Sequence, residues 1–114
     1  MYTNPDVTRD VAKRQQIERA IIRCLVRELL RHGFRLTVFD GVAEPALRDS
    51  RKFSEVWDAV GNTDNDEIVA ELGETRLWFL LVYGNDGYDV LSDYTCESET
   101  YIPETLKLIE KHNS

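Results

Sequence analysis

Carboxylates gathered around one predicted turn are the residues of this sequence with the clearest potential for chemistry. Asp86, Asp89 and Asp93 lie in the run VYGNDGYDVLSDY, which spans residues 82–94. On an extended strand Asp89 and Asp93 project to the same face, where neighbouring carboxylates can share a metal ion or a proton. The sequence places no histidine beside them, so a turn followed by a solvated strand face is the competing interpretation.

A second group of acids resembles the start of a calcium-binding loop but does not fit one. A loop that begins at Asp64 and continues through Asp66 needs an oxygen ligand at the fifth position and a glycine at the sixth. The sequence has Ile68 and Val69 there. Residues 63–66 are therefore predicted to form a solvated loop.

Histidine and cysteine chemistry is poorly supported. His32 falls at the end of a predicted helix and His112 in the C-terminal tail, so neither suits a metal site or a catalytic triad. Cys24 lies on the apolar side of the first helix, and Cys96 follows the last strand. The two form no CxxC pair, so reduced thiols are expected. We therefore predict no catalytic residue, no metal and no cofactor.

Arginines recur every four residues along the first predicted helix and share one broad face, here called the basic ridge: Arg19, Arg23 and Arg27, continued by Arg31. Residues 1–35 hold eight basic and four acidic side chains, whereas the remainder holds six basic and seventeen acidic ones. The ridge could bind phosphates, bind a protein or pair with the acidic body. The net charge of −7 argues against a nucleic-acid partner.

The elements that must carry these residues follow the order α-β-α-β-β-β-α. Apolar residues at helical spacing precede Gly33, which suits the position just after a helix end. Gly73-Glu74 is typical of a two-residue hairpin turn. We predict one α+β domain over residues 1–114, with a four-stranded, mainly antiparallel sheet and flanking helices. The expected helices are 8–32, 44–60 and a C-terminal helix with Pro103 in its first turn; the expected strands are 34–39, 67–72, 75–83 (central) and 88–94.

The strand expected at 75–83 is apolar on both of its faces. Trp78, Leu80 and Val82 point one way and the residues between them the other. Such a strand needs cover on both sides. Helices could supply both layers; if they cover one face only, the other must meet a protein partner or a second copy of the chain.

The run FLLVYGNDGYDVLSDYT at residues 79–95 resembles a segment of small uncharacterised bacterial and prophage-encoded proteins, which reads VYGNDGWDVISDYT. Those proteins are also similar in their opening helix, in a glycine-led strand like 33–39 and in an acidic loop comparable to 62–67. Tyr88 stands where many of them carry Trp. The resemblance implies a short accessory protein of phage or mobile-element context, and it carries over no activity and no catalytic residue.

These observations favour a non-enzymatic accessory protein that binds another protein in phage–host conflict. Tyr88, Asp89, Asp93 and Tyr94 are the predicted binding residues, because tyrosines beside carboxylates suit an interface with an arginine-bearing partner. The alternative is a small metal-dependent hydrolase that uses the acids of the last hairpin. No apolar run suits a membrane helix and no signal pattern opens the chain, so a cytoplasmic protein without membrane contact is expected. A homodimer is the other partner considered.

Overall fold

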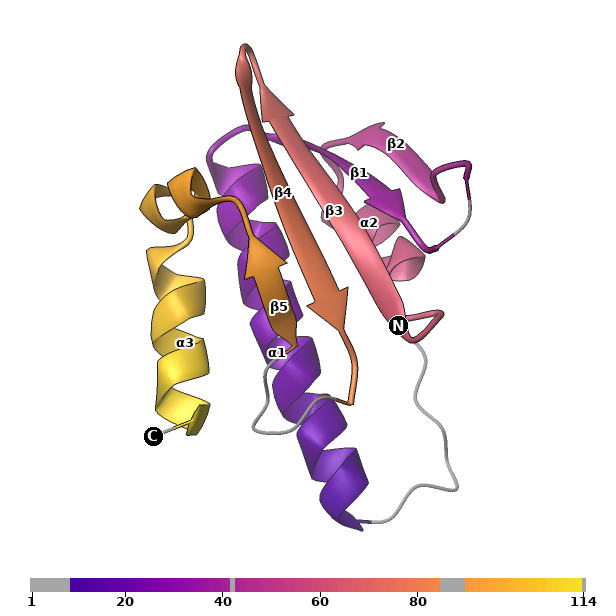
Figure 1. Ribbon diagram of the computed structural model, residues 1–114, viewed down its shortest axis with the longest axis vertical. Coiled ribbons are helices and arrows are strands. Elements are labelled where there is room, and N and C mark those ends of the chain that lie inside the picture. The colour runs from indigo at the N-terminus through magenta and orange to yellow at the C-terminus, as the bar shows by residue number, and fades with distance from the viewer. Residues whose placement is uncertain (1–8, 42, 85–89, 114) are drawn as a thin grey trace.

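A sheet of five antiparallel strands in the order β2-β1-β3-β4-β5 forms the centre of this protein (Figure 1). The computed structural model describes residues 9–41, 43–84 and 90–113. In that part of the chain no helix is both long enough and apolar enough to cross a membrane. The elements are α1 (Arg9–Arg31), β1 (Arg35–Phe39), β2 (Leu47–Ser50), α2 (Phe53–Ala59), β3 (Asn65–Leu72), β4 (Thr75–Val82), β5 (Leu91–Tyr94), the 3-10 turn η2 (Cys96–Thr100) and α3 (Pro103–Asn113).

The α+β class is confirmed, but the predicted four-stranded sheet and element order are wrong. Residues 47–50, expected inside a helix spanning 44–60, instead form the edge strand β2, in which Ser50 lies opposite Leu36 of β1. The register shifts along this pair, and Asp49 has a φ of 48°, which a right-handed helix does not contain. The helical spacing of the apolar residues was a weaker signal here than pairing with the open edge of β1.

The strand expected at 75–83 is β4, an interior strand as predicted, and it lies next to the middle strand β3. β4 lies inside the sheet, between β3 and β5. β3 and β4 pair over their whole lengths, from Asn65 opposite Val82 to Leu72 opposite Thr75. Gly73 has a φ of 59° in the turn, as a tight hairpin requires.

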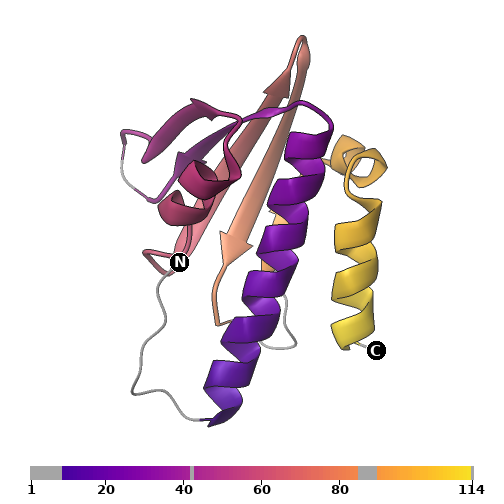
Figure 2. The same ribbon diagram turned by 180° about the vertical axis from the view of Figure 1, so that it is seen from behind.

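The three α-helices lie on the same face of the sheet (Figures 1 and 2). Leu77, Phe79 and Leu81 of β4 point toward these helices and have no exposed surface. The alternate residues of β4 point the other way, and Trp78 and Leu80 among them are half-buried. The opposite side of the sheet, here called the open face, has no helix over it in the described part of the chain.

Helix α1 supplies a large share of the core and ends in a C-cap at Gly33. Its fully buried residues recur at spacings of three and four, as an amphipathic helix requires. At its end the backbone N–H of Gly33, with a φ of 93°, donates to Leu30, and that of Phe34 donates to Leu29. These two bonds satisfy helix-end carbonyls in the Schellman arrangement. The fully buried residues of α1 are Ile21, Ile22, Leu25, Val26 and Leu29.

A buried carboxylate joins α1 to α3. Glu28, which is 3% exposed, accepts hydrogen bonds from the backbone N–H groups of Glu104 and Thr105 at 3.1 and 2.6 Å. The first N–H groups of a helix lack partners within the helix and favour negative charge. Glu28 therefore caps a helix far along the chain, a role that its place in the sequence does not indicate.

Candidate functional site

The structure describes only part of the predicted binding hairpin. Tyr88, Asp89 and Asp86 lie outside the described residues. Asp93 is exposed on β5, opposite Leu80 of β4. Its register places it on the open face, so its carboxylate is available to a partner.

Tyr94 has a mixed role. It is half-buried and packs against the core. Its hydroxyl donates to Glu99 at 3.0 Å, and burial together with this carboxylate raises the pKa of Tyr94. The next residue, Thr95, exchanges two hydrogen bonds of 3.0 Å with the backbone of Trp78. Tyr94 therefore helps to attach β5 to β4, and its hydroxyl is already engaged.

The open face carries an apolar centre between charged rows. Val69 is 6% exposed, and Trp78 beside it is half-buried. A hollow of about 390 Å³ adjoins this centre, between the strands and the segment that leads into β2. Three successive rows across the strands are Arg35–Glu71–Arg76, Thr37–Val69–Trp78 and Phe39–Glu67–Leu80–Asp93.

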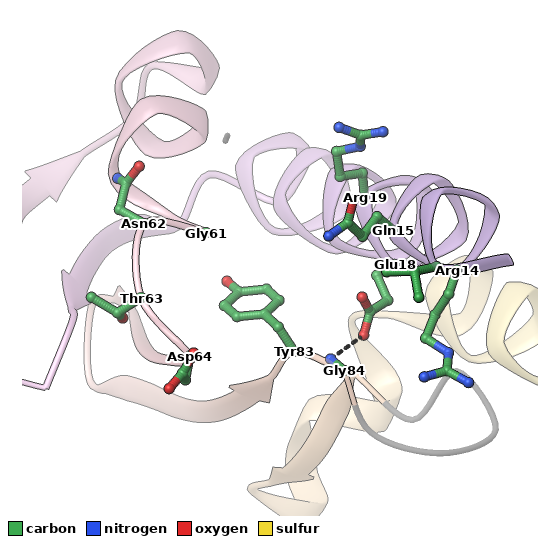
Figure 3. A pocket seen from close by; sticks show the side chains of 11 residues that line it. Arg14, Gln15, Glu18, Arg19, Gly61, Asn62, Thr63, Asp64, Tyr83 and Gly84 are labelled. Carbon is green, nitrogen blue, oxygen red and sulfur yellow. Dashed lines mark hydrogen bonds between the residues drawn. The ribbon is translucent and has the colours of Figure 1, made fainter. Parts of the chain in front are cut away.

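A separate pocket of about 350 Å³ lies between the first half of α1 and the strand ends (Figure 3). Both charge signs line it, together with an apolar surface from Val11 and the ring of Tyr83. Its polar lining comes from Arg14, Gln15, Glu18 and Arg19 of α1, the loop Gly61, Asn62, Thr63 and Asp64, and Gly84.

Two buried carboxylates, Asp66 and Glu18, connect the segments that surround this pocket. Asp66 has no exposed surface and accepts hydrogen bonds from the backbone N–H of Gly61, at 2.8 Å, and from the Tyr83 hydroxyl. Glu18 is 2% exposed and accepts from the backbone N–H of Gly84 at 2.9 Å, the dashed line in Figure 3. The first carboxylate joins the loop after α2 to β3 and β4, and the second joins α1 to the chain that leaves β4.

Burial governs the protonation of these groups. It raises the pKa of Asp66, an effect that the bonds from Gly61 and Tyr83 partly offset and that Asp40 reinforces. Burial also raises the pKa of Glu18, against the Gly84 N–H and Arg14. The pKa of Tyr83 is raised by burial and by Asp66, so the phenol remains a donor at neutral pH.

These carboxyl groups can hold a proton, and the Thr63 hydroxyl lies in the same pocket lining. The described wall of the pocket contains no serine, cysteine or histidine. Asp66 and Asp40 each have a buried Oδ1 that accepts no hydrogen bond from the described residues. For Asp66, burial raises the pKa and so favours the protonated form.

The sequence contained signals for both buried carboxylates. Asp66 is in phase with Ile68 and Ala70 on the buried face of β3, and the predicted solvated loop at 63–66 is wrong at this residue. Glu18 precedes Ile21 by three residues and so lies on the buried side of α1. An acid in phase with an apolar face is the pattern that identifies such residues.

Two arginines of the basic ridge lie over aromatic rings of α2. The Arg23 guanidinium lies 5.3 Å from the centre of the Trp57 ring, and that of Arg27 lies 4.9 Å from the Phe53 ring. Arg19 lines the pocket beside Tyr83. Arg23 and Arg27 therefore join α1 to α2, whereas Arg31 pairs with Glu104 of α3 at 3.4 Å.

One group in the described part of the chain has the spacing of a metal site: Cys24, Glu28 and Glu104, whose ligand atoms lie within 4.8 Å of one another. Glu28 already accepts the bonds that cap α3, so helix capping accounts for this cluster. Both cysteines are free, as expected; Cys96 is exposed and Cys24 is half-buried rather than in the core.

Comparison of the chain with family models, curated proteins and solved structures gave no match.

Proposed function

We propose that this chain is a non-enzymatic accessory protein that binds another protein through the open face of its sheet. The observation that carries the proposal is the one-sided cover of the sheet. Helices bury one face of β4, whereas Trp78 and Leu80 on the other face are left half-buried. Soluble proteins that expose a contiguous apolar patch with a polar rim commonly use it for binding.

The composition of the open face supports a protein as the partner. An aromatic and aliphatic centre surrounded by charged side chains is the usual anatomy of a protein interface. The row with Leu80 carries Glu67 and Asp93 as its acids. A partner that presents apolar side chains beside lysine or arginine complements this arrangement.

The resemblance of the last hairpin to prophage-encoded proteins supports a setting in phage–host conflict, inside the cytoplasm. The alternative function is a metal-dependent hydrolase that uses Asp86, Asp89 and Asp93. Calorimetry with Mg²⁺, Mn²⁺ and Ca²⁺ separates the two proposals. Tight binding of one ion that is lost in Asp89→Asn supports the hydrolase.

The protein-binding proposal is tested by capture from bacterial lysate with three forms of the protein. We expect the wild type and the control Lys107→Glu, which alters an exposed residue of α3, to retain the same protein. We expect Leu80→Lys to lose it while keeping its circular dichroism spectrum. Retention by Leu80→Lys contradicts the proposal. Sedimentation of the wild type provides the second check, because a dimer that Leu80→Lys dissociates identifies a second copy as the occupant instead.

A further inference from the structure

A groove runs along the outer side of α1, on the side of the molecule opposite the open face. Figure 2 shows α1 with α2 on one side of it and α3 on the other. Two adjoining hollows of about 390 and 260 Å³ lie there and share Ala20 and Arg23. Its lining includes the small side chains of Ala20 and Cys24, the guanidinium groups of the basic ridge and the Glu104 carboxylate, which pairs with Arg31.

The two central arginines of the groove are held in place by rings rather than by acids. Arg23 lies over Trp57 and Arg27 over Phe53, and these two rings stack at 5.7 Å. Neither arginine forms an ion pair with a described carboxylate. A guanidinium whose face rests on a ring keeps its N–H edge available for an oxyanion and loses less freedom when it binds one.

The spacing of these arginines matches carboxylates on a helix. Arg27 follows Arg23 by four positions in α1, which is an advance of about 6 Å along the helix axis. Carboxylates four residues apart on a second helix have the same separation, and each can accept two N–H bonds from one guanidinium. The small Ala20 and Cys24 leave room for apolar side chains of that helix between the charged contacts.

A nucleic acid fits the same groove less well. The ring faces that bases would stack on are occupied by Arg23 and Arg27, and by the contact between Phe53 and Trp57. The chain carries a net charge of −7, which repels a long polyanion, whereas a short acidic helix meets much less of this repulsion.

We infer that the α1 groove binds an acidic helix of a protein partner, with Arg23 and Arg27 as the receptors for two carboxylates four residues apart. This surface is separate from the open face, so the inference does not depend on the proposed function. Arg31 extends the row, although its guanidinium also pairs with Glu104 at 3.4 Å.

The test measures binding of two labelled synthetic peptides by fluorescence anisotropy. Both have the same length and the same numbers of Glu, Ala and Leu residues; in one the Glu residues lie four positions apart, and in the other they are grouped two positions apart. We expect the first peptide to bind at least about tenfold more tightly. Its binding should fall at least tenfold in Arg23→Lys/Arg27→Lys, which keeps both charges and removes the planar forks.

Arg35→Gln/Arg76→Gln, which removes two charges from the open face, is the matched control and should bind as the wild type does. The inference is overturned if neither peptide binds, if both bind equally, or if the control loses as much affinity as the lysine variant. A twelve-residue oligothymidine is the third probe. If it binds more tightly than the peptides and the lysine variant loses it, the groove is a nucleic-acid site instead.

Discussion

Thr105 of α3 donates both its backbone N–H and its hydroxyl to the carboxylate of Glu28 in α1, 77 residues earlier in the chain. The Glu104 N–H donates to the same carboxylate. This buried side chain thus receives three hydrogen bonds from the first turn of α3 and fixes where α3 begins. Buried bonds to a charged acceptor are among the stronger ones in proteins.

Removing this carboxylate should destabilise the protein strongly. We expect Glu28→Ala to lower the free energy of unfolding by about 3 kcal/mol, since it leaves helix-end N–H groups buried without acceptors. Glu28→Gln should cost less, because its amide oxygen still accepts. Urea titration followed by circular dichroism measures both, with Glu110→Ala at an exposed position of α3 as the control. An equal loss in Glu28→Ala and Glu110→Ala contradicts the capping role.

Neighbouring residues of β4 should respond very differently to truncation. Phe79 is fully buried on the helix side, so Phe79→Ala should cost about 4 kcal/mol. Leu80 lies on the open face, and we expect Leu80→Ala to cost about 1 kcal/mol. Thermal unfolding of the two variants measures the difference. Equal losses mean that both faces of the sheet are covered.

The buried carboxyl of Asp66 should leave a signature in the pH dependence of stability. Burial raises its pKa above the ordinary value of 3.8, so the folded protein binds this proton more tightly than the unfolded chain does. The stabilisation that comes from protonating Asp66 is fully present below pH 3.8, and it is lost as the pH rises through the raised pKa of the folded state. Asp66→Asn, which stays neutral, should therefore gain stability relative to the wild type as the pH rises above 3.8.

Urea midpoints at several pH values measure this difference. Asp58→Asn, at an exposed position, controls for the loss of one charge. A difference between Asp66→Asn and the wild type that stays constant with pH means that Asp66 does not take up a proton on folding.

Removal of the Tyr83 hydroxyl, which donates to Asp66, should also destabilise the protein. We expect Tyr83→Phe to lower the free energy of unfolding by about 2 kcal/mol.

The two thiols should react at different rates. Cys96 is exposed, whereas burial and the neighbouring carboxylates Glu28 and Glu104 raise the pKa of Cys24. Because the thiolate is the reactive species, we expect Cys96 to react at least about tenfold faster with an aromatic disulfide reagent near pH 8. Absorbance of the released thiolate follows both phases, and Cys96→Ser should abolish the fast one. A single phase in the wild type contradicts this expectation.

The elements with strong local signals were predictable from the sequence. The apolar periodicity of α1, the Gly73-Glu74 turn and Pro103 at the start of α3 each appear where expected. β2 was not predictable, because a four-residue edge strand depends on pairing with β1 more than on its own composition. The predicted acidic site extends into residues 86 and 89, outside the described part of the chain.

The buried acids were missed for a different reason. Because charged residues are normally solvated, the sequence predicts a solvated loop at Asp66 and indicates no special role for Glu28. Their burial depends on donors that the fold brings from far along the chain, the Tyr83 hydroxyl for Asp66 and the first turn of α3 for Glu28. The phase of Asp66 with the apolar face of β3 indicates that it is buried, but no local pattern identifies the distant donors that both carboxylates use.

The long separation in sequence between Glu28 and Thr105 also bears on which element of the fold detaches first. β3, β4 and β5 each pair with the strand that precedes or follows them in sequence, so this meander closes only short loops. Docking of α3 instead closes a loop of most of the chain. Helix α3 is therefore the element that we expect to detach first in native-state fluctuations, with amide hydrogens that exchange while those of β3 and β4 remain protected. Because Glu28 caps α3, we expect Glu28→Ala to speed amide exchange in α3 more than in β3 and β4.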